Sequence, residues 1–243
     1  MHDSLLSRLY AKIPRTLQAA SRLAMDLTRT YRLNSWSQDG EDRILCEIFK
    51  NCPQGFYVDV GAHHPRRFSN TYFLYRSGWR GLNIEPDPDL SFAFRVFRPR
   101  DAFVSAAVAE IPDTGILFRF LDPALNTLDP ETAQVRRTEG WDVRDKIPVR
   151  ISPLRTILSE HGVDHIDFLN IDVEGLDLQV LKSIDWQRHA PSVIAVEVHT
   201  DDVLHAGTTD VHAFLSQKGY SLAAKTLRTA IYRTNRSFGS ATP

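Results

Sequence analysis

Acidic side chains stand at the ends of several short apolar runs in this sequence, where they could bind a polar ligand or accept a proton. In FYVDVGAHHP, Asp59 lies two residues before Gly61, and RGLNIEPD places Glu85 directly after the next apolar run. A glycine after a strand lets a ligand approach the backbone, and the following helix offers N–H groups to an anion. Only Gly61 of a dinucleotide-binding G-x-G-x-x-G motif is present, so a smaller anion such as an amino acid carboxylate fits better.

Glu85 indicates the other half of the ligand. An acid at the end of the second strand, about two dozen residues after the turn, accepts the two hydroxyls of a ribose. A ribose joined to an amino-acid-like group describes S-adenosylmethionine. The sequence therefore predicts that the turn at Gly61 and Glu85 contact this cofactor.

Two later apolar runs end in residues suited to proton transfer. NIDVEG holds Asp172 and Glu174, and VEVHT holds Glu197 and His199. Residues two apart in an extended chain point to the same side, so each pair projects together. His199 is the preferred general base because only its side chain has an ordinary pKa near neutrality. These residues predict a centre that aligns an acceptor hydroxyl and removes its proton.

A metal site is the alternative for the same residues. Carboxylates and an imidazole suit a divalent ion, and its candidate ligands are Asp172, Glu197 and His199. We favour a base that works without metal, because Glu197 and His199 lie two apart on one strand and would need unusual bending to bind one small ion.

The scaffold for these residues follows from an alternation of apolar runs and helical patterns. The predicted strands are Phe56–Val60, Gly81–Ile84, Ala102–Val108, Ile166–Ile171 and Val193–Val198. The predicted helices are Glu41–Lys50, Asn70–Ser77, Leu90–Phe97, Leu154–Glu160, Leu176–Ile184 and Val211–Lys218. This order predicts an α/β fold with a doubly wound, mostly parallel sheet whose strand C-termini meet at one edge. The polar stretch Leu121–Lys146 has no clear period and is typical of a functional loop or lid.

Composition and charge agree with one large domain. The chain has 243 residues, is 42% hydrophobic, and carries 29 basic against 30 acidic residues, so no charge field indicates nucleic acid as a partner. Its two cysteines, Cys46 and Cys52, form neither a zinc motif nor a disulfide framework. Cysteines that form no disulfides are typical of a reducing compartment, so we expect a cytoplasmic protein.

The first residues differ from the rest. Apolar side chains recur at steps of three and four from Leu5 to Tyr31, and residues 1–32 carry 6 basic and 2 acidic residues, a net charge of +4. This pattern predicts a basic amphipathic helical extension over residues 1–33, followed by one domain over 34–243. The extension would pack on its own domain, join a second copy in a homo-oligomer, or make a peripheral membrane contact. It lacks the apolar core of a signal peptide or membrane span.

Four motifs together resemble one family. SQDGEDRIL, YVDVGAHHPRRFSNTYFLYRSGWRGLNIEPDP, DFLNIDVEGLDLQVLKSIDW and IAVEVHT are similar, in this order, to the FkbM-type family of S-adenosylmethionine-dependent methyltransferases. The resemblance covers Ser37 to Tyr232. It implies a class I, Rossmann-like methyltransferase fold and O-methylation of sugar or polyketide hydroxyls. His63 stands where such proteins often have Asn.

The resemblance also implies further cofactor contacts. Those residues are Gln38, Ser69, Asn70, Ser105, Ala106 and Asp172. The first three would lie on segments that close over the methionine part, which Asp59 and Gly61 face. Ser105 and Ala106 would lie where such folds hold the adenine ring.

The sequence thus predicts an S-adenosylmethionine-dependent O-methyltransferase that acts on a hydroxyl, of a sugar in a bacterial polysaccharide or natural-product glycoside. Its partner would be a small-molecule or glycan acceptor. One alternative is a non-catalytic module of the same fold in a polysaccharide-assembly complex, and the presence of both cofactor-binding and catalytic acids counts against it. Another is a nucleotide-dependent oxidoreductase, and the missing glycines count against that.

Overall fold

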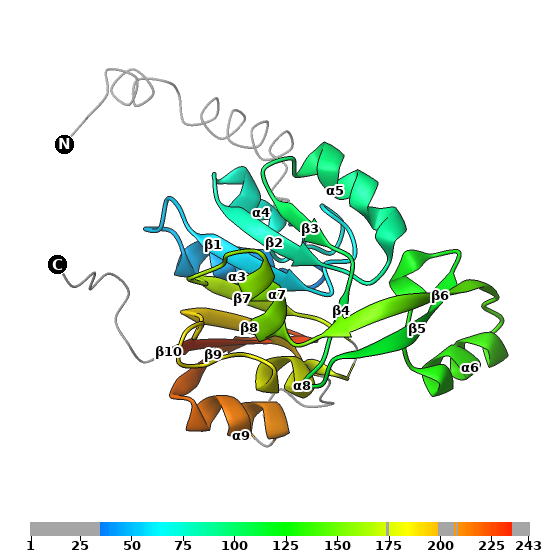
Figure 1. Cartoon of the computed structure of the whole chain (residues 1–243). Coiled ribbons are helices and arrows are strands. Elements are labelled where there is room, and N and C mark those ends of the chain that lie inside the picture. The colour runs from blue at the N-terminus through cyan, green and yellow to red at the C-terminus, as the bar shows by residue number, and fades with distance from the viewer. Residues whose placement is uncertain (1–34, 174, 199–206, 208, 235–243) are drawn as a thin grey trace, which may run out of the picture. The chain divides into compact units, whose positions relative to one another are not determined.

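The computed structural model describes residues 35–173, 175–198, 207 and 209–234. In this part, seven strands form one sheet in the order β3-β2-β1-β7-β8-β10-β9 (Figure 1). The strands are β1 (Phe56–Val60), β2 (Arg80–Ile84), β3 (Ala102–Val104), β7 (Phe168–Ile171), β8 (Val193–Glu197), β9 (Tyr220–Lys225) and β10 (Thr229–Thr234). Strands β3 to β8 of this order are parallel, and β10 is antiparallel to both of its neighbours. The predicted mostly parallel sheet is confirmed.

Helices cover both faces of this sheet. They are α3 (Glu41–Ile48), α4 (Tyr72–Arg76), α5 (Ser91–Phe97), α7 (Leu154–Glu160), α8 (Asp177–Lys182) and α9 (Asp210–Gln217). Every predicted helical segment is a helix, and α7 has the predicted bounds. Tyr57 of β1 packs with α3 and α4, whereas Val58 packs with α7 and α8 on the other face. Burial from both sides explains why β1 is a nearly unbroken apolar run.

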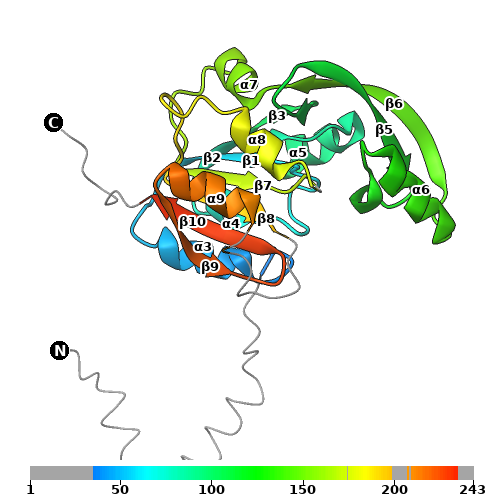
Figure 2. The same cartoon turned by 90° about the horizontal axis from the view of Figure 1, so that it is seen from below.

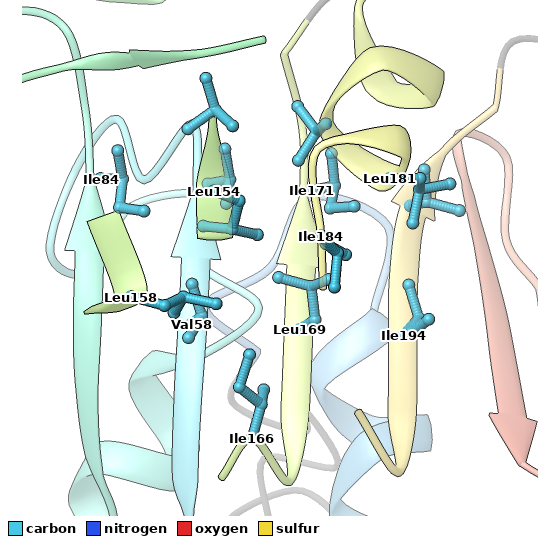
Figure 3. Packing of buried hydrophobic residues seen from close by; sticks show 14 of the residues in the cluster. Val58, Ile84, Leu154, Leu158, Ile166, Leu169, Ile171, Leu181, Ile184 and Ile194 are labelled. Atoms are coloured by element: carbon cyan, nitrogen blue, oxygen red, sulfur yellow. The ribbon is translucent and has the colours of Figure 1, made fainter. Parts of the chain in front are cut away.

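The core between the sheet and α7 and α8 is closely packed (Figure 3). Val58, Leu169 and Ile194 of three neighbouring strands are fully buried there, as are Leu154 and Leu181 of the helices. Each buried Val, Leu or Ile side chain contributes roughly 1.5–3 kcal/mol relative to exposure. The strand ends that carry the candidate site therefore extend from a rigid platform.

A second sheet of three strands, β4-β6-β5, forms an arm that projects from the main sheet in both views (Figures 1 and 2). We define the arm as residues 107–152. It contains β4 (Ala107–Val108), β5 (Asp113–Phe120), α6 (Pro130–Thr138) and β6 (Val143–Ser152).

The arm corrects two predictions. The single strand expected over Ala102–Val108 is wrong, because β3 ends at Val104, the chain leaves the main sheet at Ser105, and β4 pairs with β6. The loop expected over Leu121–Lys146 is also wrong, since it contains α6 and the beginning of β6. Asp129 caps α6 by accepting two backbone N–H groups of its first turn.

The helical extension predicted for residues 1–33 lies outside the described residues and stays a prediction, as does the domain boundary after it. No helix within the described ranges is long and apolar enough to cross a bilayer.

Candidate functional site

The turn after β1 is locked against the end of β7 at Gly61. Its φ of +79° lies in the left-handed region that favours glycine. A Cβ at this position would lie 1.8 Å from the carbonyl oxygen of Asp172. The N–H groups of Gly61 and Ala62 donate to the carbonyl of Ile84, at 3.0 and 3.1 Å. The close approach that we expected for a ligand is thus made by the Asp172 backbone, and the predicted cofactor contact of Gly61 stays a prediction.

Glu85 lies directly after β2 and is 7% exposed. Its two carboxylate oxygens accept the N–H groups of His63 and Asp87, each at 3.0 Å. His63 has a φ of 43°, which non-glycine residues adopt rarely. Burial raises the pKa of Glu85 to about 7, although the two N–H groups oppose this shift. The carboxyl group is therefore held in one orientation beside the turn after β1.

Asp59 is enclosed within β1 and is 3% exposed. One oxygen accepts from the hydroxyl of Thr71 at 2.5 Å, and the other accepts from the Asn170 amide on β7 at 2.8 Å. These contacts join β1 to β7 and to the loop before α4. The predicted contact of Asp59 with the methionine part of the cofactor stays a prediction.

Ser69 and Asn70 also lie inside the fold, at 4% and 8% exposure. The Ser69 hydroxyl accepts the N–H groups of Thr71 and Tyr72 at the start of α4, at 3.2 and 3.1 Å. The Asn70 amide donates to the side chain of Asn170 at 3.0 Å. In the described chain their role is to fix the start of α4 to the sheet, and a contact with the cofactor stays a prediction.

Arg98, which is 1% exposed, holds the loop that leads from the β1 turn to α4. Its guanidinium donates to the side chains of Ser69 at 2.5 Å and Thr71 at 2.8 Å. It also donates to the side chain of Asn83 at 3.0 Å and the carbonyl of Pro65 at 2.7 Å. Sequence reasoning missed this residue, because its partners lie 15 to 33 residues away and follow no local pattern.

Asp172 and Glu197 stand side by side at the C-terminal edge of the sheet. Ile171 pairs with Val196 in the parallel strands β7 and β8, so Asp172 comes opposite Glu197. Desolvation, followed by the charge of Glu197 and a hydrogen bond to it, holds the pKa of Asp172 well above its usual range. As a residue, Asp172 is nonetheless exposed to solvent. Two neighbouring carboxyl groups of this kind disfavour each other's ionised form.

Gln38 is exposed in the short segment before α3. The next residue, Asp39, accepts from the guanidinium of Arg228 at 2.8 Å. The carbonyl of Arg228 in turn accepts the N–H of Val198 at 2.7 Å. This chain of contacts brings the Gln38 segment to the end of β8, next to Glu197.

The β9–β10 turn borders the same edge, and sequence reasoning missed it. The Lys225 ammonium donates to the carbonyls of Thr226 and Leu227, at 2.9 and 3.1 Å. Burial lowers the pKa of Lys225, whereas nearby carboxylates, including that of Glu197, oppose the shift. A cation thus lies near the acidic pair.

Ser105 and Ala106 form the link at which the chain leaves the main sheet. The Ser105 hydroxyl donates to the carbonyl of Pro86 at 3.2 Å, and the N–H of Glu85 donates to the carbonyl of Val104 at 3.0 Å. Ser105 is exposed, whereas Ala106 is 1% exposed and belongs to the core. The structure therefore brings Ser105 next to the loop that carries Glu85.

Arg119 of β5 ties the arm to this same loop. It donates to both carboxylate oxygens of Asp145 at 2.7 Å, and it reaches Asp87 at 3.0 Å and Asp89 at 2.7 Å. The N–H of Asp87 donates to Glu85, so Asp87 links Arg119 to the acid that we expect to bind the ribose.

Glu174 and His199 lie outside the described residues, so the preferred base and its companion carboxylate stay predictions. Within the described ranges, no group of three or more His, Cys, Asp or Glu side chains is placed to hold a metal ion. The alternative metal site of Asp172, Glu197 and His199 includes a residue beyond those ranges.

A sheet whose order reverses between β1 and β7, with acids after β2 and β7, is a scaffold that binds a nucleoside-type cofactor at its C-terminal edge. The sequence model of the methyltransferase FkbM domain matches residues 59–222, more than half of the chain. The chain belongs to the FkbM methyltransferase family and is an S-adenosylmethionine-dependent methyltransferase of the class I fold.

Several solved structures resemble the chain. A methyltransferase from Geobacter sulfurreducens is 13% identical, with 94% of each chain covered and a TM-score of 0.43. An O-methyltransferase from Bacillus cereus, in complex with SAH, is 12% identical, with 91% of each chain covered and a TM-score of 0.39. No curated protein sequence matches the chain. The family assignment rests on the sequence model alone.

Proposed function

We propose that this enzyme transfers a methyl group to a hydroxyl oxygen of a sugar, in a bacterial polysaccharide or a natural-product glycoside. The observation that carries the proposal is the pair Asp172 and Glu197, which meets at the open edge beside the turn after β1. Such a pair can orient a neutral hydroxyl and accept its proton.

The residues at this edge suit S-adenosylmethionine, which supplies the methyl group when bound. The cofactor carries positive charge on its sulfur and its amino group, and the acids Asp172 and Glu197 complement that charge. Glu85 is oriented by two N–H groups and would accept from the ribose hydroxyls. Ser105, next to the Glu85 loop, would border the adenine.

Proton removal is the task of the protein in this reaction. As the oxygen of the acceptor takes the methyl group, its proton passes to a base, for which we propose His199 with Asp172 and Glu197 beside it. A sugar hydroxyl is weakly acidic, so a positioned base contributes roughly 10²- to 10⁴-fold to the rate.

Transfer of a labelled methyl group tests the proposal. Purified enzyme is incubated with labelled cofactor and glycans from cells that lack the gene, and the products are analysed by mass spectrometry. We expect one added methyl group on a sugar hydroxyl and a loss of roughly 10²- to 10⁴-fold in His199→Ala with the cofactor affinity retained. Methylation of nitrogen or carbon alone would refute O-methylation. Loss of activity with a chelator and recovery with Mg²⁺ would show that a metal ion, and not a metal-independent base, activates the hydroxyl.

A further inference from the structure

An open hollow of about 370 Å³ is lined in part by the loop that follows the β1 turn. Its lining residues are Trp36, His64, Arg66, Arg67 and Phe97. Three of them come from the short run His64–Arg67, Trp36 precedes α3, and Phe97 ends α5. The lining combines cationic groups with aromatic rings and contains no acid.

Arg66 is held in place by rings and not by an ion pair. Its guanidinium lies 5.2 Å from the ring centre of Phe97 and 5.7 Å from that of Tyr72. Among the residues that the structure describes, no carboxylate lies within ion-pair distance of it. Stacking on rings fixes the side chain without neutralising its charge.

Arg67 has only a weak partner. Its guanidinium lies 3.6 Å from the Asp122 carboxylate, and both side chains are about half exposed. Ion pairs of this kind contribute about 0–1 kcal/mol. An incoming anion can therefore compete for Arg67.

His64 adds a third donor. Its Nδ1 accepts the N–H groups of Arg66 and Arg67, at 3.0 and 2.9 Å. Because Nδ1 accepts these two N–H groups, the neutral ring carries its proton on Nε2. Burial and the two arginines also lower the pKa of His64, which favours the neutral ring. Every ionisable group of the hollow thus donates hydrogen bonds.

The hollow is connected to the candidate site from two sides. His63, next to His64, donates its N–H to Glu85 at 3.0 Å. Trp36 accepts the N–H of Ser69 at 2.9 Å and leads within three residues to Asp39, which binds the β9–β10 turn beside Glu197.

Planar guanidiniums match the oxygens of a phosphate, and exposed rings stack on a sugar or base. We propose that this hollow binds the phosphate ester of a phosphorylated sugar, which makes the acceptor a sugar phosphate. This inference rests on the proposed function. The acidic edge at Asp172 and Glu197 suits the cationic cofactor, whereas the hollow suits an anion.

Calorimetry on the full-length enzyme tests the hollow without requiring methyl transfer. The probes are glucose 1-phosphate, UDP-glucose and unphosphorylated glucose, and the variants are Arg66→Gln and Arg67→Gln. Arg80→Gln is the matched control, because Arg80 is exposed but outside the hollow. We expect at least one phosphorylated probe to bind much more tightly than glucose, and each hollow variant to lose about tenfold or more in affinity.

The two phosphorylated probes distinguish the source of the phosphate. Stronger binding of glucose 1-phosphate indicates a monoester acceptor, and stronger binding of UDP-glucose indicates a diphosphate-linked one. The proposal is overturned if glucose binds as tightly as the phosphorylated probes, or if Arg80→Gln loses as much affinity for these probes as the two hollow variants do. It is also overturned if neither phosphorylated probe binds at millimolar concentration. Unchanged S-adenosylmethionine affinity in each variant shows that the fold is intact. Methyl transfer without phosphate binding refutes only the proposal that the hollow binds a phosphate ester. Phosphate binding without methyl transfer refutes only the proposed function.

Discussion

Among the single residues at the C-terminal edge, Glu85 makes cofactor binding depend on pH. Glu85 is buried, and its pKa is raised to about 7, so at neutral pH it is only partly ionised. The ribose hydroxyls would donate to the ionised carboxylate. Protonation below pH 7 therefore competes with cofactor binding.

We predict that the affinity for S-adenosylmethionine falls about tenfold for each pH unit below 7 and is constant above it. The substitution Glu85→Ala should weaken cofactor binding by about 1.5–3 kcal/mol at pH 8 and remove the dependence of the affinity on pH. Calorimetry between pH 5.5 and 8.5 measures both effects. Glu110→Gln, an exposed carboxylate, is the control. An unchanged dissociation constant in Glu85→Ala, with the fold intact, removes Glu85 from the site.

Gly61 is constrained by its backbone conformation and by the carbonyl of Asp172. Gly140 in the arm has a similar φ of +95°, but a Cβ there meets nothing within 4 Å. We expect Gly140→Ala to cost about 1 kcal/mol, for the left-handed conformation alone. Gly61→Ala should cost clearly more, because its Cβ would overlap the Asp172 carbonyl at 1.8 Å.

Urea denaturation measures the free energy of unfolding of both glycine variants, and calorimetry measures their cofactor affinity. Gly61→Ala should also lose affinity, because the turn must separate from β7. Equal destabilisation of the two variants would contradict the steric argument.

At the scale of elements, the arm is coupled to the loop after β2 through Arg119. Burial is the main cause of the raised pKa of Glu85, and the charge of Asp87 raises it further. The Arg119 guanidinium, 3.0 Å from Asp87, offsets that charge. We predict that Arg119→Gln shifts the pH dependence of cofactor binding upward by about one unit. Arg119→Lys should keep the wild-type profile.

Arg144→Gln is the matched control for Arg119. Arg144 contacts Asp89 at 3.3 Å and Asp145 at 3.6 Å, and no contact with Asp87 is found within the described ranges. In Arg144→Gln, the pH dependence of cofactor binding should equal that of the wild type. If Arg119→Gln lowers affinity equally at every pH, the arginine only supports the fold and the electrostatic coupling is wrong.

At the scale of the whole molecule, charge is divided unequally along the chain. Residues 1–32 carry a net charge of +4, while the complete chain has a net charge of −1. We predict that deletion of residues 1–33 reduces binding to anionic vesicles, or changes the oligomeric state, more than it changes cofactor affinity.

Flotation with phosphatidylglycerol vesicles and light scattering measure these effects, and calorimetry with S-adenosylmethionine is the control. An unfolded truncated protein would show instead that the segment belongs to the core of the domain.

The sequence by itself determined four strands of the parallel sheet and the acids at their ends. β1, β2, β7 and β8 are buried on both faces, so each is a short apolar run that local composition reveals. Because parallel strands end at one edge, Glu85, Asp172 and Glu197 could be assigned to a common site from the sequence alone.

Only the tertiary structure decided what these residues touch. The partner of Gly61 is a carbonyl 111 residues further along the chain, and Arg98 and Arg119 find their partners across different elements. The arm was missed because its strands are half exposed and lack a continuous apolar run. Such contacts depend on how distant segments pack, and no periodicity within one segment records them.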